Sequence, residues 1–426
     1  MFAVGIDVSS KYSTAAVFQT KTDMVIKPFD FKHNTEGFAS VVEKLKGLDG
    51  EIRIVMECTG RYYEAVAANL HNAGFFVSAV NPLAIKRYQD GISVRVVKTD
   101  KADAKKLAKF ALDNWEILQQ YSPMDTIRYN LKTLNRQFQM SSKMRTALSN
   151  NLVALLETCY PGIRSSFDSE PRSDGSQKWV DFVDTFWHVD CVAKLSQKEF
   201  IERYHTFCKK HRYHFSEEKA IELHKEARLK YAVVPKDDMC KMLVREAVSQ
   251  LNAVTRTMET YRAKMNELAS QLPEYDTVMA LYAVGPSTGP QLMAEIGDIR
   301  RFAHQKSLVG FAGIDPIKDD SGDKVKDSMP TSKRGSPYLR KTLFCIMETM
   351  IKKQPEGEPV YQFIDKKRSE GKKYYVYMTA GMTKFLRIYY GKVRDALKAK
   401  GLWKQPGIQP DNESDQKDKQ QNNVDS

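Results

Sequence analysis

Four acidic side chains stand where a folded chain could gather them around a metal ion. Asp7 lies near the end of an apolar run, GIDVSS, and Glu57 ends a second one, RIVMEC. Asp100 and Asp103 stand three residues apart at the start of a predicted helix, so both point to the same side. Taken singly, each acid fits a strand end or a helix cap, because acids favour the first helical turn. Together they predict a site for Mg²⁺ or Mn²⁺, which prefer carboxylate oxygens.

The chemistry that such a site would serve is cleavage of a phosphodiester. Two divalent ions about 3.5–4 Å apart can stabilise both the attacking and the leaving oxygen. Lys101 and Lys105 flank the two aspartates, and we expect them to face phosphate. The sequence therefore predicts metal-dependent chemistry on nucleic acid.

The segments that carry the acids alternate between predicted strands and helices. We expect strands at 2–8, 13–19, 25–31, 51–57 and 75–80, and helices at 34–47, at 63–74, after Pro82 and from about Asp100. The order β-β-β-α-β-α-β-α is typical of a ribonuclease H-like α/β domain. In that fold the first and fourth strands are neighbours and the last helix crosses near the same edge, which would bring the four carboxylates together.

Composition limits the partners. The chain has 426 residues with 66 Lys and Arg against 53 Asp and Glu, a net charge of +13 and a pI of about 9.2. Such a surplus favours a polyanion, nucleic acid first and an anionic membrane surface second. No apolar run reaches the roughly 18 residues of a membrane span, and the opening lacks the features of a signal peptide. The six cysteines are scattered, which predicts free thiols in a reducing cytoplasm.

Two long helices are predicted beyond the α/β domain. Apolar residues follow a 3-4 repeat over 127–159, and Val244, Leu251, Met258, Met265 and Leu272 repeat every seven residues. Heptads of this kind predict a coiled coil, either an antiparallel hairpin within the chain or a seam between two chains. We expect an α/β domain at 1–120, a helical region at 121–275 with an insert at 160–234, a mainly helical C-terminal domain at 276–403 and a disordered tail at 404–426.

The C-terminal domain carries two candidate phosphate contacts. In LYAVGPSTGPQLMAEIG, Gly285 starts either a helix-hairpin-helix with N–H groups open to phosphate or a tight turn between packed helices. In SKRGSPYLR, the cations Lys333, Arg334 and Arg340 are predicted phosphate contacts, with a solvated basic loop as the alternative.

Two further groupings allow more than one interpretation. His205, Cys208, His211 and His214 recur every three residues, which could hold zinc, but a basic aromatic surface for nucleic acid is favoured because this spacing drifts around a helix. Region 366–394 interleaves lysine and arginine with tyrosine. Its rings either stack on unpaired bases or pack inward from an amphipathic helix.

At these residues the chain resembles the DEDD-type insertion-sequence transposases, the IS-one-ten family. The resemblance rests on the blocks GIDVSSK, ECTGRYYEAVAANLHNAGFFVSAVNP and KTDKADAKKLA, and on residues 282–343, which are similar to the family's C-terminal transposase domain. It implies a catalytic domain similar to the Holliday-junction resolvase RuvC. It also implies that Asp7, Glu57, Asp100 and Asp103 bind divalent metal.

The resemblance implies a full recombination mechanism. Ser321, in DDSGDK, matches the serine that attacks the scissile phosphate, and Ser332 and Ser336 are the competing candidates. DNA would be cut and rejoined, guided by a bridge RNA that the element encodes, by a dimer or tetramer at the bacterial nucleoid.

Three rival functions remain. A junction-resolving nuclease would use metal-activated water and need no serine. A sugar kinase would share the opening GID but lacks its phosphate loop, since Val8 and Ser9 replace the glycine and threonine. An RNA-binding scaffold would carry a decayed site.

Overall fold

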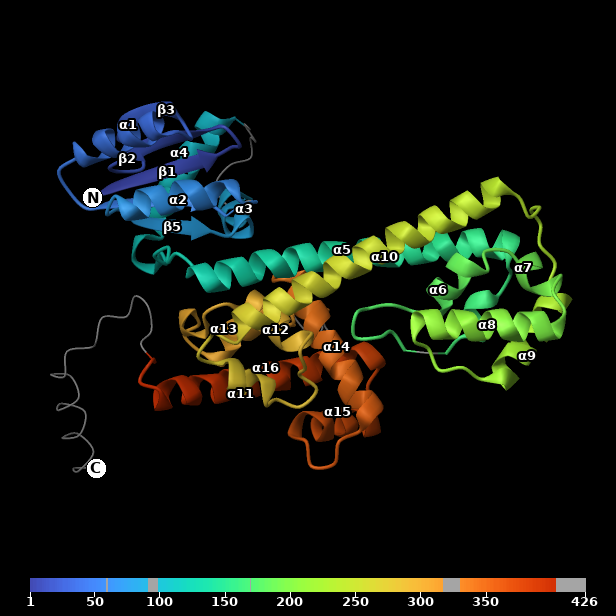
Figure 1. Cartoon of the computed structure of the whole chain (residues 1–426). Helices are drawn as coiled ribbons and strands as arrows, with labels where there is room; N and C mark the ends of the chain where they lie inside the picture. Colours follow the sequence, from blue (N-terminus) through green and yellow to red (C-terminus); the bar gives the residue numbers. More distant parts are fainter. Residues whose placement is uncertain (59, 91–98, 169, 317–329, 404–426) are drawn as a thin grey trace, which may run out of the picture. The chain divides into compact units, whose positions relative to one another are not determined.

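The chain folds into two compact units (Figure 1). The structure is a computed structural model that describes residues 1–58, 60–90, 99–168, 170–316 and 330–403. The first unit comprises Met1–Pro123, and the second begins at Met124. The tail predicted at 404–426 lies outside the described residues. Among the helices described, none is long and apolar enough to cross a membrane.

The first unit is built on a five-stranded sheet with the order β3-β2-β1-β4-β5. Its strands are β1 (Phe2–Val8), β2 (Tyr12–Phe18), β3 (Met24–Lys32), β4 (Ile52–Glu57) and β5 (Phe76–Val80). The pairs β1–β2 and β2–β3 are antiparallel, whereas β1–β4 and β4–β5 are parallel. This is the predicted ribonuclease H-like order, with the first and fourth strands side by side.

Helices cover both faces of this sheet. They are α1 (Thr35–Lys46), α2 (Tyr62–Asn72), α3 (Pro82–Asp90) and α4 (Asp100–Asp113), followed by the short helix Trp115–Ile117. Alternate residues of β1 point to opposite faces. Val4 and Ile6 join the cluster that contains α1 and α2 residues, and Ala3 joins the cluster that contains Leu107 of α4. Residues 3, 5 and 7 therefore face α4.

Gly5 sets how closely α4 approaches the sheet. A Cβ atom at this position would overlap the backbone of Ala104 and Ala108. Only glycine therefore allows α4 to lie directly against β1, and this contact places the start of α4 beside the end of the strand.

We expect Gly5→Ala to lower the free energy of unfolding of the first unit by about 3 kcal/mol or more, since neither backbone segment can move aside. Urea denaturation of the full chain measures the loss. Gly47→Ala is the matched control, because its Cβ would meet nothing nearer than 3.6 Å at a φ of −72°. Equal unfolding midpoints for the two variants would contradict this account.

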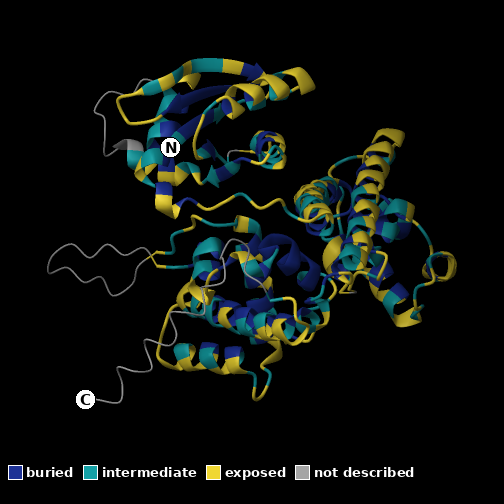
Figure 2. Ribbon diagram, turned by 90° about the vertical axis from the view of Figure 1, so that its left-hand side faces the viewer, coloured by how far each residue is buried: buried dark blue, intermediate teal, exposed yellow. Residues whose placement is uncertain are grey.

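The second unit is helical. Its helices are α5 (Thr126–Cys159), α6 (Lys178–Thr185), α7 (Asp190–Ala193), α8 (Gln197–His211), α9 (Glu217–Leu229), α10 (Asp238–Ala269), α11 (Tyr275–Met279), α12 (Thr288–Ile296), α13 (Gln305–Ala312), α14 (Pro337–Lys353), α15 (Pro359–Ser369) and α16 (Tyr374–Ala399). Figure 2 shows buried residues on the sides of the helices that face other elements, and exposed residues on the outer sides.

The two long helices α5 and α10 pack along each other within one chain (Figure 1). Every predicted seven-residue position is buried, from Val244 to Leu272. The heptads also predict a second buried stripe three residues further on, at Ala247, Val254, Tyr261 and Leu268. Of these only Ala247 is buried and the other three are half-buried, whereas Val248, Thr255 and Ala269 are buried. The intrachain pairing matches the hairpin alternative. Regular coiled-coil packing and a seam between chains stay predictions.

Two hydrophobic cores form along this helix pair. One end packs with the insert, where Phe182, Phe200 and Tyr204 are buried. The other end packs with α11 to α16, where Leu343 and Phe385 are buried. The helix pair thus anchors both the insert and the C-terminal helices.

Candidate active site

Asp7 and Glu57 come together at the shared end of two parallel strands. Ile6 of β1 pairs with Met56 of β4, so Asp7 and Glu57 are the next residues along neighbouring strands. Val55 packs in the same cluster as α4, and Glu57 lies two residues further on. By strand alternation, both carboxylates therefore lie on the α4 face of the sheet.

The first turn of α4 brings the other two acids to this face. Thr99 caps the helix by accepting a hydrogen bond from the Ala102 N–H, at 3.2 Å. Asp100 and Asp103 follow in the first turn, where carboxylates are stabilised by the helix dipole. Because Gly5 allows α4 to pack directly against β1, the first turn of α4, with both aspartates, lies at the end of the strand that carries Asp7.

The electrostatics of Asp7 reflect the presence of the other three carboxylates. Burial raises the pKa of Asp7 from 3.8 to about 6, and the charges of Asp100, Asp103 and Glu57 add to this rise. A nearby like charge disfavours ionisation of a carboxyl group. Asp100, Asp103 and Glu57 therefore lie near enough to Asp7 to affect its charge, and a metal site formed by all four stays a prediction.

Two of the acids are bonded to neighbouring side chains in this conformation. The Tyr12 hydroxyl donates to Asp100 Oδ2 at 2.9 Å, and Lys106 Nζ donates to Asp103 Oδ1 at 2.8 Å. No three His, Cys, Asp or Glu side chains of the described ranges stand close enough together to hold an ion. The donor set, four carboxylates on one face, nonetheless has the chemistry that Mg²⁺ prefers. Binding would require Asp100 and Asp103 to exchange these partners for the ion.

The raised pKa of Asp7 has a consequence for stability. Because the pKa is higher in the folded protein, ionised Asp7 destabilises the metal-free fold above pH 6, and this cost disappears below the unfolded value of 3.8. We expect Asp7→Asn to raise the free energy of unfolding by about 1 kcal/mol at pH 7.5 in EDTA, allowing for solvent screening of a half-exposed group.

Thermal unfolding of both proteins from pH 4 to 8 measures this difference, which should fade as the pH falls. Mg²⁺ at pH 7.5 should stabilise the wild type and not the variant, by mass action. A variant that is less stable than the wild type at pH 7.5 in EDTA would contradict the assigned electrostatics.

The predicted nucleophile, Ser321, lies outside the described residues, but the ends of its segment are fixed. Pro316 and Thr331 form an antiparallel bridge. The Ser332 N–H donates to the Asp315 carbonyl at 2.8 Å, and the Lys333 N–H donates to the Gly313 carbonyl at 3.0 Å. The described residues on either side of this segment therefore lie side by side.

The two competing serines are held by carboxylates. The Ser332 hydroxyl donates to Asp315 at 2.6 Å, and the Ser336 hydroxyl donates to Glu295 at 2.7 Å. Ser336 also caps α14 by accepting from the Leu339 N–H. Ser336 therefore has a structural role, whereas Ser332 has the geometry of a hydroxyl beside a base.

The side chains of the predicted phosphate contacts differ in their exposure to solvent. Lys101, Lys333 and Arg334 are exposed, whereas Lys105 is half-buried. Arg340 donates through Nη1 to the carbonyls of Ala312 and Gly335, both at 3.0 Å, and so holds the basic motif together. The Gly285 N–H donates to Thr288 Oγ1 at 3.0 Å. The helix-hairpin-helix and the phosphate roles of these residues stay predictions.

The position of Gly335, in the basic motif SKRGSPYLR, has no room for a side chain. A Cβ atom there would overlap the carbonyl of Phe311 and the N–H of Gly313, which itself has a φ of +66°. The backbone before α14 therefore lies against the end of α13.

A buried polar network in the second unit was not predicted from the sequence. Glu295 accepts from Asn135 at 2.7 Å and from Arg136 at 3.0 Å, besides Ser336. These contacts connect α5, α12 and α14. The signal in the sequence was Asn135 among the apolar positions of α5.

The described residues of the insert do not bring the candidate zinc ligands together. Cys208 is buried, the His205 ring packs against Phe215, and His211 lies 3.5 Å from Asp181. No cluster in the described part of the chain has metal-binding geometry, so the zinc interpretation gains no support.

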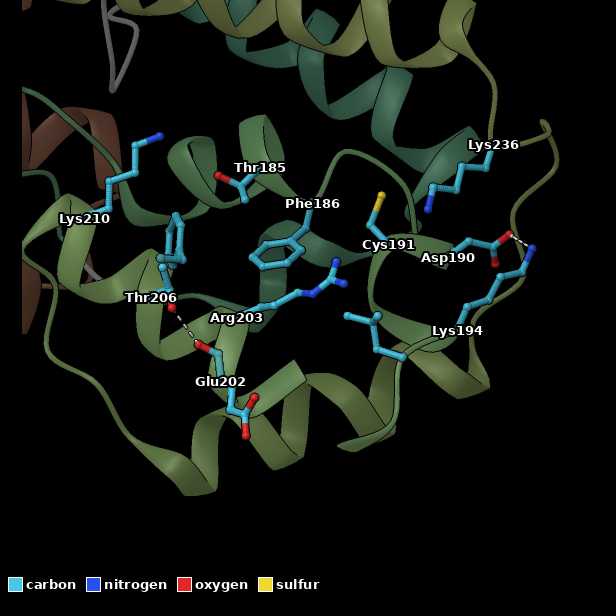
Figure 3. Close-up of a pocket in the computed structure, with 12 residues that line it drawn as sticks. Thr185, Phe186, Asp190, Cys191, Lys194, Glu202, Arg203, Thr206, Lys210 and Lys236 are labelled. Atoms are coloured by element: carbon cyan, nitrogen blue, oxygen red, sulfur yellow. Dashed lines mark hydrogen bonds and ion pairs between the residues drawn. The ribbon is translucent and has the colours of Figure 1, made fainter. Parts of the chain in front are cut away.

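The insert does contain a basic pocket of about 770 Å³ (Figure 3). Its side chains come from α6, α7, α8 and the segment before α10, and four are cations: Lys194, Arg203, Lys210 and Lys236. Lys194 is paired with Asp190 at 2.7 Å. The aromatic residues of the pocket, Phe186 and Phe207, are buried.

Two family models match the chain. Residues 4–161 match the model of the DEDD transposase of IS110, and residues 275–362 match the transposase model of the IS116/IS110/IS902 family. The insertion element IS110 43.6 kDa protein of Streptomyces coelicolor is 21% identical over 78% of this chain and 79% of its own. The pilin gene-inverting protein of Moraxella lacunata is 23% identical over 92% of this chain and 95% of its own. RuvC of Thermus thermophilus aligns with 28% of this chain and all of its own length, at 16% identity and a TM-score of 0.24.

Proposed function

Because the chain belongs to the IS110 (IS-one-ten) family of transposases and is a DNA transposase or recombinase, we propose that it cuts and rejoins DNA by metal-assisted serine attack. One observation supports the proposal: burial and the charges of Asp100, Asp103 and Glu57, which come from α4 and β4, raise the pKa of Asp7 in β1 to about 6. Four converging negative charges need a cation, and phosphodiester chemistry is what such a cation serves.

Asp7, Glu57, Asp100 and Asp103 would hold one or two Mg²⁺ or Mn²⁺ ions. When bound, the ions would stabilise the negative charge that develops on the attacking and leaving oxygens. Lys101, exposed beside the aspartates, would hold the neighbouring phosphate. Tyr12 and Lys106 would release Asp100 and Asp103 when the ions bind.

Ser321 would be the nucleophile. A bond forms between its Oγ and phosphorus as the bond to the leaving strand's oxygen breaks, and the hydroxyl proton passes to a base at the site. A second strand end would then displace the serine and restore a phosphodiester. A bridge RNA would select donor and target DNA, and subunits of a dimer or tetramer would share active sites in the cytoplasm. The nucleophile, the exchange of strands, the bridge RNA and the shared active sites rest on the family resemblance.

The alternative is a junction-resolving endonuclease that uses metal-activated water. It would need the four carboxylates and not Ser321, and the convergence of the acids supports it equally well. The two functions differ in the product: the serine route leaves protein attached to DNA.

The test incubates purified protein with DNA that spans the element ends, RNA transcribed from the flanks, and Mg²⁺. Products are separated on a denaturing gel with and without protease. A protein–DNA band that protease removes, together with rejoined strands, is expected. Free ends without that band would replace the proposal with the water-using nuclease, and no cleavage in any metal would reject both.

A further inference from the structure

An exposed aromatic cluster lies at the start of α16. We call it the aromatic surface: Phe344 of α14 with Tyr374, Tyr375 and Tyr377 of α16. Tyr375 is 73% exposed and Tyr374 is 41% exposed. The Tyr375 ring stacks on Phe344 with centroids 6.4 Å apart and meets Tyr374 edge-on at 5.2 Å. These contacts orient the rings and still leave most of Tyr375 open to solvent.

The backbone around the aromatic surface is well defined. Gly371, with a φ of +72°, follows the end of α15, and the Lys372 N–H donates to the Lys367 carbonyl at 3.2 Å. Helix α15 lies close to α16 at Gly381, where a Cβ atom would come within 2.7 Å of Ile364. The rings are therefore displayed from a fixed turn between two packed helices.

Cations precede the tyrosines of this surface in the chain, and the Arg368 guanidinium lies 6.0 Å from the centre of the Tyr377 ring. The end of α15 and the turn that follows carry Lys366, Lys367, Arg368, Lys372 and Lys373. Lys367 pairs with Glu370 at 2.6 Å and Arg368 with Asp365 at 3.8 Å. Lys366, Lys372 and Lys373 are exposed, and within the described residues no ion pair holds them. An acid, Glu348, also lies near Tyr374, where its charge adds to burial in raising the pKa of the tyrosine.

The rest of α16 behaves differently. Tyr389 and Tyr390, from the same tyrosine-rich stretch, are buried in the core, and the Tyr390 hydroxyl donates to the Phe302 carbonyl at 3.1 Å. Of the two alternatives for region 366–394, inward packing therefore holds for these residues. It does not account for Tyr374 and Tyr375.

We propose that the aromatic surface binds single-stranded nucleic acid, with unpaired bases stacked on Tyr375 and Tyr374 and phosphates held by Lys366, Lys372 and Lys373. Exposed aromatic rings among cations are what sequence-tolerant binding of single strands requires. A duplex does not fit as well, because its bases are already stacked on one another. A protein partner is disfavoured because lysine is depleted at protein interfaces.

The basic pocket of the insert (Figure 3) shows why charge alone is not enough. It offers cations such as Arg203 and Lys210, but Phe186 and Phe207 are only 4% and 3% exposed. Neither ring face is open to a base. Substitutions in this pocket are therefore a suitable control for the effect of positive charge alone.

The test measures fluorescence anisotropy of labelled 15-nucleotide RNA, DNA of the same sequence and the matching DNA duplex, in EDTA. It rests on the proposed function only in taking nucleic acid as the partner, and it stays informative if cleavage fails. We expect Tyr375→Ala to weaken single-strand binding about tenfold and duplex binding less than twofold. Tyr375→Phe should bind as the wild type does, because the ring is kept.

Lysine variants should act through charge. The double variant Lys372→Gln, Lys373→Gln should weaken the binding of every ligand. For single strands, the slope of log K against log salt should fall in magnitude by about 0.7 for each phosphate that is no longer neutralised. The controls are Tyr231→Ala, which removes a tyrosine 83% exposed in the insert, and Arg203→Gln with Lys210→Gln in the pocket. Both should leave the single-strand preference unchanged.

The outcomes separate cleanly. Tighter binding of the RNA that depends on Tyr375 identifies RNA as the ligand, and tighter binding of the DNA strand identifies a displaced DNA strand. Single-strand affinity within twofold of the wild type in Tyr375→Ala overturns the proposal. Equal losses on single strands and duplex also overturn it, because they show that no base stacks on the ring.

Discussion

Replacing Asp7 with asparagine is expected to lower metal-dependent strand cleavage on the order of 10³-fold. The charges of Asp100, Asp103 and Glu57 all act on Asp7. An amide keeps the shape of the side chain and removes the charge that holds a cation. Cleavage of labelled element-end DNA in Mg²⁺, followed under single-turnover conditions, measures the loss.

The matched control is Asp113→Asn, at the other end of α4. Asp113 pairs with Lys21 at 2.5 Å and accepts from Tyr88 at 2.6 Å, and both partners lie away from the acidic site. This variant should cleave within a fewfold of the wild type although it loses a surface ion pair. Equal activity of Asp7→Asn and wild type would reject the metal site.

The Asp7→Asn substitution should have opposite effects on activity and on stability. Ionised Asp7 costs free energy in the metal-free fold because three acids and partial burial oppose its charge. That unfavourable arrangement is what a divalent cation relieves. Active sites commonly keep such destabilising groups, and removing them stabilises the protein. A variant that is both more stable in EDTA and inactive in Mg²⁺ fits only a functional cluster.

The sequence was sufficient to predict that Asp7 and Glu57 end neighbouring strands, because strand positions and strand order follow from general rules. Strand β1 spans Phe2–Val8, as predicted, and the other strands agree within one residue. Neighbouring parallel strands end at one edge, so Asp7 and Glu57 had to be close once the strand order was known. The partners of Asp100 and Asp103 could not be predicted in the same way. Tyr12 is 88 residues from Asp100, and no periodic pattern connects them.

The helical region shows where periodicity stops being informative. The seven-residue stripe of α10 is buried as predicted, but burial of Val248 and Thr255 shifts the second stripe by one position. A straight helix drifts relative to a 3.5-residue repeat. The partner helix α5 also carries Asn135, whose amide donates to Glu295 and thus binds a third helix. Polar contacts of this kind depend on elements 160 residues away.

Arg340 illustrates a limit of reading charge from sequence. Within SKRGSPYLR it resembled Lys333 and Arg334, and all three were predicted to contact phosphate. In the fold it donates to the carbonyls of Ala312 and Gly335, whereas the other two are exposed. The sequence alone does not distinguish an arginine that donates to backbone carbonyls at the end of one helix and before the start of another from an arginine open to solvent. The positions of both backbone segments are needed for that.

Replacing Ser321 with alanine is expected to remove the covalent protein–DNA product and to lower strand joining on the order of 10³-fold, because no other hydroxyl would be in line with the phosphate. The gel with and without protease measures both effects. Binding of the element-end DNA should stay within a fewfold of the wild type, which separates loss of chemistry from loss of the complex.

The choice of control decides what that result means. Ser332 is the sharper comparison, because its hydroxyl donates to Asp315 at 2.6 Å and a carboxylate could activate it. Under our proposal, Ser332→Ala loses a hydrogen bond worth about 1–2 kcal/mol and still forms the covalent product. If Ser332→Ala loses that product and Ser321→Ala keeps it, the nucleophile is Ser332 with Asp315 as its base. If neither change affects cleavage and both leave free ends, water is the nucleophile and the four carboxylates suffice.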